Sequence, residues 1–239
     1  VALEFGLVHS AHKDKVLNSL VETVINNNYH FTTGILGTKA IIGVLWENNP
    51  ADLIFRLLDQ TDFPSFLDMM KSNGITAERW NPDAYIGSGM NSFNHHMFGG
   101  GPGAWMVKGV AGISAIEPGY EQILIQPEVV GNLTRGNGAI STPKGQVSTS
   151  WKKLSDTQFM LNVTIPANAT AIVAIPTLGN VNPAIAESGA TIYKQGFVSG
   201  RRGIYSLHQK TDERIAFHTG SGVYSFVMTS KNSGQKSKN

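Results

Sequence analysis

The chain has 239 residues, of which 41% are hydrophobic and 15% charged, with 19 Lys and Arg against 17 Asp and Glu. This length and apolar content allow a sizeable core and exclude intrinsic disorder, and no stretch approaches the roughly 18 to 20 apolar residues of a membrane span. A net charge of +2 without a basic cluster gives no reason to expect a nucleic-acid partner, and the absence of cysteine excludes disulfides, thiolate nucleophiles and cysteine-bound metals.

The first half of the chain has the apolar spacing of helices, with Val16, Leu20 and Val24 on one stripe. The helices are expected to begin near Ser10, Lys39, Pro50 and Pro64, and a fifth, interrupted by the glycines of 99–103, covers 94–110. Asn49 suits the cap of the third helix, Pro50 its first turn, and Gly74 the end of the fourth. No strand pattern separates these helices, so this half is expected to be all-α.

The second half alternates with the period of strands. The expected strands cover 122–127, 146–151, 159–166, 171–176, 204–207 and 222–227. Short strands separated by Gly, Asn and Pro are typical of an antiparallel β-sandwich. We therefore expect an α+β multidomain chain with a helical domain over 1–116, a sandwich over 117–230 and a disordered, Lys-rich tail over 231–239.

The N-terminus has no basic segment followed by an apolar core, so no signal peptide is visible. It opens in mid-pattern at Val1, which indicates that processing or design has removed what came before. Five helices in a row usually form a bundle or a solenoid, and a helical segment that begins in mid-pattern could also be the last part of a larger toroid of helix pairs. Glycosylation sequons at Asn132, Asn162 and Asn168 predict a secreted, extracellular glycoprotein.

The densest cluster of functional residue types lies between Gly74 and Trp105. Within it, Glu78, Arg79 and Trp80 are consecutive in an expected loop, where catalytic groups are common. An indole can stack on the apolar face of a sugar while the carboxylate and guanidinium bind hydroxyl groups or a water. The alternative is an exposed ion pair beside a core tryptophan.

The pair His95–His96 raises the question of a metal. Zinc on a helix prefers ligands at i and i+4, whereas adjacent side chains point about 100° apart, so we expect no metal site. A single inward His95 could bind a ligand hydroxyl, or it could be a core histidine. No phosphate or dinucleotide motif is present, so no cofactor is expected.

The order of the motifs is more informative than any one of them. They are Thr33-Gly34 to Thr38, Asp62-Phe63-Pro64, Glu78-Arg79-Trp80, Ser92-Phe93-Asn94-His95, Ile125-Gln126-Pro127 and Ile165-Pro166. This run, which covers nearly the whole chain, resembles the C-terminal third of an α-L-rhamnosidase of glycoside hydrolase family 78.

The resemblance implies the last helices of an (α/α)6 barrel followed by a β-sandwich, and the release of terminal α-L-rhamnose from glycosides or polysaccharides with inversion. It places the general base at Glu78 and sugar contacts at His95, with Asn94, Arg79 and Trp80 beside them. In the family the general acid lies on earlier barrel helices. The implied partners are a rhamnose-containing carbohydrate and the N-terminal remainder of the same enzyme.

The chemistry is consistent with half a catalytic site. Inversion needs two carboxyl groups roughly 6.5 to 9.5 Å apart, and only Glu78 is singled out here. Ala77 before Glu78 and His96 after the Asn-His pair depart from the family pattern. This leaves two alternatives: a polysaccharide lyase cleaving rhamnosyl-glucuronate linkages, with His95, His96 and Arg79 in its site, and a non-catalytic carbohydrate-binding fragment.

Overall fold

A computed structural model describes residues 1–48, 51–71, 74–85, 87, 89 and 92–230. They form two compact units, residues 1–105 and residues 106–239. The expected tail over 231–239 and the expected cap at Asn49 and Pro50 lie outside the described residues. Among the described residues, no helix is both long and apolar enough to cross a membrane.

The first unit is helical, as the sequence predicts. Its elements are the short 3-10 helix η1 (Ser10–His12), α1 (Lys13–Asn26), α2 (Ile35–Glu47), α3 (Ala51–Leu58), α4 (Phe66–Met70), the 3-10 turn η2 (Pro82–Tyr85) and α5 (His96–Trp105). The start of α2 was predicted four residues too late, because Gly34 and Gly37 weaken the local helix signal. Helix α4 begins after its N-cap Ser65, whose hydroxyl accepts from the Asp68 N–H at 3.1 Å, and not at Pro64.

The glycine run does not interrupt α5, contrary to the prediction. Residues 99–103 are helical, and α5 packs against α2. A Cβ on Gly101 would lie 3.1 Å from the Ile42 side chain and 3.4 Å from the Lys39 backbone. The glycine therefore permits a close approach of two helices, which offsets its cost in helix propensity. Beyond Trp105 the chain continues as a π-helical turn, η3 (Met106–Val110), in the second unit.

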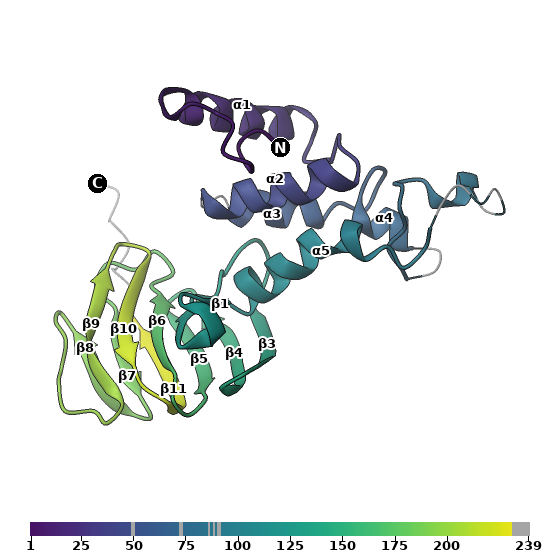
Figure 1. Ribbon diagram of the computed structural model, residues 1–239. Helices are drawn as coiled ribbons and strands as arrows, with labels where there is room; N and C mark the ends of the chain where they lie inside the picture. Colours follow the sequence, from purple (N-terminus) through teal and green to yellow (C-terminus); the bar gives the residue numbers. More distant parts are fainter. Residues whose placement is uncertain (49–50, 72–73, 86, 88, 90–91, 231–239) are drawn as a thin grey trace, which may run out of the picture. The chain divides into compact units, whose positions relative to one another are not determined.

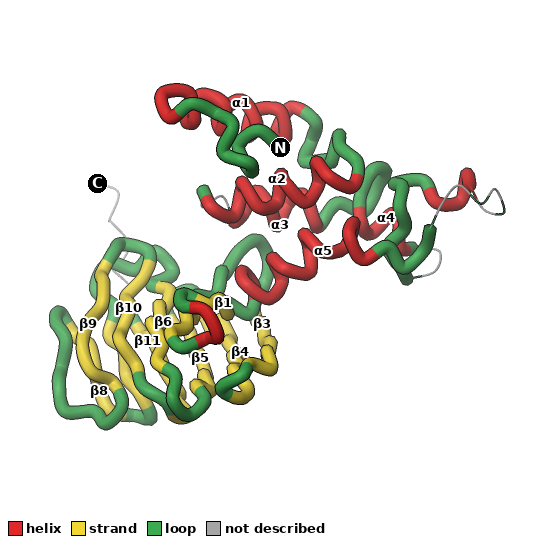
Figure 2. Tube along the Cα trace, in the orientation of Figure 1, coloured by secondary structure: helices red, strands yellow, loops and turns green. Residues whose placement is uncertain are grey.

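The second unit is a β-sandwich of two sheets (Figure 2). Its strands are β1 (Ile113–Ala115), β2 (Gln122–Ile125), β3 (Arg135–Thr142), β4 (Gly145–Ser155), β5 (Gln158–Ile165), β6 (Thr170–Pro176), β7 (Ala184–Glu187), β8 (Ala190–Lys194), β9 (Ile204–Lys210), β10 (Arg214–Thr219) and β11 (Gly222–Thr229), with the 3-10 turn η4 (Pro118–Tyr120) before β2.

One sheet has the order β1-β2-β6-β10-β9 and the other β3-β4-β5-β11-β7-β8. All pairs are antiparallel except β2 with β6, which is parallel. The boundary predicted at residue 116 falls after β1, a three-residue strand that pairs with β2. A strand of that length is too short to reveal its period in the sequence.

Candidate functional site

The helical unit contains a cavity of about 610 Å³. The first turn of α2, the coil after α4 and two separate phenylalanine side chains line it. The lining residues are Gly34, Ile35, Leu36, Gly37, Phe63, Glu78, Arg79, Trp80, Asn81 and Phe98. The wall combines apolar side chains with one carboxylate, one guanidinium and one amide. Such a mixture is typical of sites for small polar ligands that also carry apolar surface.

Glu78 is positioned by two short backbone contacts between its coil and the segment before α5. Its N–H donates to the Ser92 carbonyl at 3.0 Å, and the neighbouring residues Ala77 and Phe93 form an isolated antiparallel bridge. The Glu78 carboxylate is half-buried, and its Oε2 accepts long hydrogen bonds from the Ser92 N–H (3.3 Å) and Oγ (3.4 Å). From the described residues, the hydrogen bonds to this carboxylate reach Oε2 and none reaches Oε1.

Trp80 both lines the cavity and belongs to the core. Its indole stacks on Phe31 with centroids 5.4 Å apart and contacts the rings of Phe66 and Phe98 at 5.1 and 4.5 Å. The indole Nε1–H donates to the carbonyl of Thr33 at 2.7 Å. This bond ties the coil that carries Glu78 to the start of α2. The sequence left open whether Trp80 is a core residue or a site residue. In the structure the same indole packs on buried rings and lines the cavity.

The structure does not bring His95 and Asn94 to the lining of this cavity. Asn94 is exposed and has a φ of 55°, and His95 is the residue before α5. The His95 Nδ1 accepts from the Phe98 N–H at 3.3 Å, as an N-cap side chain does. This bond assigns the proton of the neutral ring to Nε2, which makes Nε2 a donor. Contact of either residue with a sugar remains a prediction.

Sequence reasoning missed most of the α2 wall. The sequence predicts that Tyr29-His30 and Thr32-Thr33-Gly34 either line a pocket or turn the chain, and of these residues only Gly34 lines the cavity. The N-cap Gly34 makes no side-chain cap hydrogen bond, and residues 34–37 at the start of α2 line the cavity. A Cβ on Gly37 would lie 2.6 Å from the Thr33 Cβ, so the turn before α2 closes tightly only over a glycine. Phe63 and Leu36, two exposed apolar side chains, form part of the wall.

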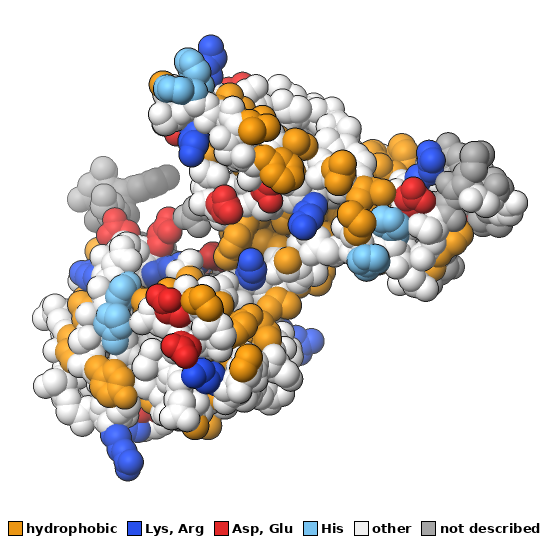
Figure 3. Space-filling view, in the orientation of Figure 1, with side chains coloured by type: hydrophobic (Ala, Val, Ile, Leu, Met, Phe, Trp, Pro, Cys, Tyr) orange, Lys and Arg blue, Asp and Glu red, His pale blue; other side chains and the backbone are white. Residues whose placement is uncertain are grey.

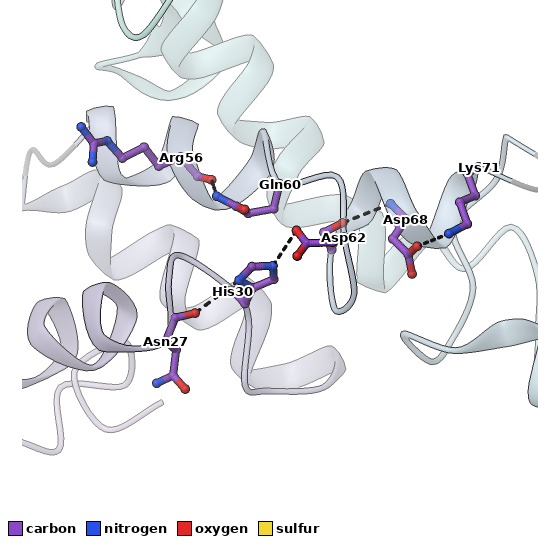
Figure 4. A network of polar contacts seen from close by, with 8 residues as sticks. Asn27, His30, Arg56, Gln60, Asp62, Asp68 and Lys71 are labelled. Carbon is purple, nitrogen blue, oxygen red and sulfur yellow. Dashed lines mark hydrogen bonds and ion pairs between the residues drawn. The ribbon is translucent and has the colours of Figure 1, made fainter.

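His30 and Asp62 link the coil after α1 to the segment that carries Phe63 (Figure 4). The His30 Nε2 lies 3.0 Å from Asp62 Oδ1, and Nδ1 lies 3.3 Å from the carbonyl of Asn27. Both ring nitrogens face oxygen atoms, so the ring bridges the coil after α1 and the segment of Asp62. The hydrogen bond from His30 holds the pKa of Asp62 below its ordinary value.

This contact predicts a pH dependence. A carboxyl group with a lowered pKa in the folded state stabilises the fold above its unfolded pKa of about 3.9, and that contribution is lost as the pH falls through the folded pKa. Asp62→Asn should therefore unfold at a lower urea concentration than the wild type at pH 6, with the gap closing below about pH 4. The Asp62 side chain is 76% exposed, so the gap should be modest. A gap that widens on acidification would contradict this reading.

Two family models match the chain. The bacterial alpha-L-rhamnosidase 6 hairpin glycosidase domain matches residues 1–110, and the bacterial alpha-L-rhamnosidase C-terminal domain matches residues 112–188. Among curated proteins, an alpha-L-rhamnosidase of Formosa agariphila is 34% identical over 182 residues, which are 74% of this chain and 19% of that protein. One from Streptomyces avermitilis is 35% identical over 181 residues, 74% of this chain and 17% of that protein.

Solved structures agree with these matches. The alpha-L-rhamnosidase from Dictyoglumus thermophilum superposes with a TM-score of 0.83 at 30% identity, covering 96% of this chain and 24% of that one. The Streptomyces avermitilis enzyme complexed with L-rhamnose gives 0.78 at 30% identity, covering 95% and 21%. The chain thus spans about a fifth of the length of the curated relatives it matches. Over residues 1–110 and 112–188, which the two models match, the chain belongs to the bacterial α-L-rhamnosidase family.

Proposed function

We propose that the chain contributes the general base to a glycoside hydrolase that releases terminal α-L-rhamnose with inversion. The observation that carries this proposal is the position of Glu78, the one carboxylate among the described lining residues of the 610 Å³ cavity. A general base needs a carboxylate oxygen free to take a proton from water. The anchoring of Oε2 by Ser92, with Oε1 left without a hydrogen bond among the described residues, meets that need.

The rest of the lining suits a deoxy sugar. Phe63 and Leu36 present exposed apolar surface, at 59% and 75%, against which the C–H groups of a pyranose can pack. Arg79 and Asn81 also line the cavity, and their side chains supply donors for hydroxyl groups.

The general acid is proposed to come from the N-terminal remainder of the enzyme. An inverting pair is roughly 6.5 to 9.5 Å apart. Of the carboxylates near Glu78 in sequence, Asp62 is held by His30 and does not line the cavity. The catalytic pair is therefore completed only when this chain is joined to, or bound by, the preceding barrel helices.

A graft tests this proposal. The chain replaces the matching segment of the Dictyoglumus thermophilum rhamnosidase, with which it superposes over 96% of its length. We expect the grafted enzyme to hydrolyse an aryl α-L-rhamnoside and the 239-residue chain alone to be inactive. Activity of the isolated chain comparable to that of the graft would contradict the half-site proposal.

The same assay separates the alternatives. None of the relatives or solved structures compared above supports the lyase reading. With a rhamnosyl-glucuronate polysaccharide in place of the aryl rhamnoside, a product absorbing as an unsaturated uronate would identify elimination. Sugar binding by a folded graft that lacks any turnover would identify a binding fragment.

We also propose that the protein is secreted and glycosylated, because the sequence contains three glycosylation sequons. Asn132, Asn162 and Asn168 are all exposed in the sandwich unit, so each is accessible for glycosylation. A fall in the mass of the native protein on enzymatic deglycosylation would support this, and an unchanged mass would contradict the glycoprotein assignment.

A further inference from the structure

Two histidines of the sandwich unit, distant from the cavity in sequence and in another unit, meet on neighbouring strands. His208 on β9 and His218 on β10 have Nδ1 and Nε2 3.0 Å apart, with ring centroids 4.6 Å apart and planes at 89°. His208 is exposed and His218 half-buried. Figure 3 shows the pale-blue histidine atoms of this unit gathered in one patch.

A β-bulge creates this meeting. Ala216 pairs with Gln209 and Phe217 pairs with Leu207, so His208 is the extra residue left between them. Bulges re-aim a side chain relative to regular alternation. Here the imidazole of His208 contacts the ring of His218, two residues after Ala216 on β10. In a regular ladder His208 and His218 would not be opposite each other, so we attribute the contact between their rings to the bulge.

The spacing of the two nitrogens matches a metal chelate. Imidazole nitrogens about 2.1 Å from one ion and at a right angle are about 3.0 Å apart, whereas a tetrahedral angle separates them by about 3.4 Å. The observed 3.0 Å, which is also the length of an ordinary hydrogen bond between the two rings, equals the spacing for the right angle. Right-angle coordination by nitrogen and water is typical of Cu²⁺ and Ni²⁺, while structural Zn²⁺ prefers a closed tetrahedron.

The geometry points to a two-histidine site for a divalent ion of the Cu²⁺ and Ni²⁺ class at His208 and His218. In the metal-free pair one ring donates its N–H to the lone pair of the other. On binding, the donor ring moves that proton to its other nitrogen, and both facing nitrogens then present lone pairs to the ion. Among the described residues no group of three or more potential ligands exists, so water completes the coordination and the ion exchanges freely.

The chelate would fasten an edge of the sandwich. β9 is the last strand of the five-stranded sheet, and β10 is its only neighbour in the strand order. An ion held between them links the edge strand to the interior strand, and any ligand that binds only the folded state raises the unfolding temperature. Protons compete for the same nitrogens, so binding should weaken on acidification.

Titration of the untagged chain with NiCl₂ at pH 7.5 tests the site. We expect a 1:1 complex with the wild type, a rise in unfolding temperature, and paramagnetic broadening of the imidazole NMR signals of His208 and His218. His208→Gln and His218→Gln should each weaken binding by at least tenfold. The matched control is His12→Gln, which removes an imidazole from another pair of neighbouring rings, His9 and His12, whose centroids are 6.1 Å apart.

Three outcomes would overturn the assignment. They are an absence of saturable Ni²⁺ binding to the wild type, affinities for both sandwich variants equal to that of the wild type, and a loss of binding in His12→Gln instead. Broadening in the wild type requires no substitution, so a variant that fails to fold does not decide the question. A complex that binds as tightly at pH 5.5 as at pH 7.5 would also contradict imidazole ligation.

Discussion

Glu78→Gln in the grafted enzyme should lower kcat for an aryl α-L-rhamnoside by about 10²- to 10⁴-fold, the usual contribution of a positioned general base. Glutamine keeps the shape of the side chain and its contact with Ser92, whose N–H and Oγ lie 3.3 and 3.4 Å from Oε2. It removes only the ability to take a proton. Rhamnose affinity should therefore stay within a few-fold of the wild-type value, as measured by calorimetry.

Two further variants sharpen this test. Ser92→Ala removes the Oγ contact but keeps the backbone N–H contact and the carboxylate, so its effect on kcat should be smaller than that of Glu78→Gln. Glu47→Gln, at the end of α2, changes a carboxylate that does not line the cavity and should leave kcat unchanged. If Glu78→Gln retains more than a tenth of the wild-type kcat, Glu78 is not the general base.

Trp80→Ala should destabilise the helical unit by about 3 to 5 kcal/mol, the usual cost of removing a large aromatic side chain from a core. The indole fills the space between Phe31, Phe66 and Phe98, and its N–H is bound to the Thr33 carbonyl at 2.7 Å. Both contributions disappear in the variant. Urea unfolding followed by circular dichroism at 222 nm measures the loss.

Trp80→Phe is the matched control for packing. It keeps an aromatic ring in the cluster but leaves the Thr33 carbonyl without the indole donor, so it should cost about 1 to 3 kcal/mol. In the grafted enzyme it should also loosen the coil of Glu78 and lower kcat. A Trp80→Ala variant within 1 kcal/mol of the wild type would show that the indole does not hold the coil to α2.

The two halves of the fold were predictable because the apolar period changes from helical to alternating along the chain. Strand β3 was missed because it contains Gly136 and Gly138, which weaken the strand signal. Their presence has a packing cause: a Cβ on Gly136 would lie 2.6 Å from the Trp151 indole, and one on Gly138 would lie 2.5 Å from the Ala111 side chain. Requirements of this kind arise from tertiary contacts and leave no periodic pattern.

The candidate site was predictable only where its residues are contiguous. Glu78, Arg79 and Trp80 line one cavity together, as the motif predicted. His95 was selected by residue type, yet its Nδ1 accepts the Phe98 N–H, a capping role that depends on where α5 begins. The α2 wall comes from a turn more than 40 residues earlier, and no local pattern links it to Glu78.

The histidine pair was not predictable for a similar reason. His208 and His218 are ten residues apart on two strands, and regular pairing would not specify their contact. Only the bulge opposite Ala216 and Phe217 brings the rings together. Neither β10 nor the bulge was expected from the sequence, which contains no metal-ligand spacing at this position.

Chemical rescue tests the role of Glu78 most directly. In a Glu78→Ala graft, azide is small enough to enter the space left by the carboxylate and needs no general base, so it can attack the anomeric carbon in place of water. With an aryl α-L-rhamnoside, azide should restore turnover at least tenfold and yield β-L-rhamnosyl azide, identified by NMR. An azide-independent rate, or a product of α configuration, would contradict Glu78 as the base of an inverting hydrolase.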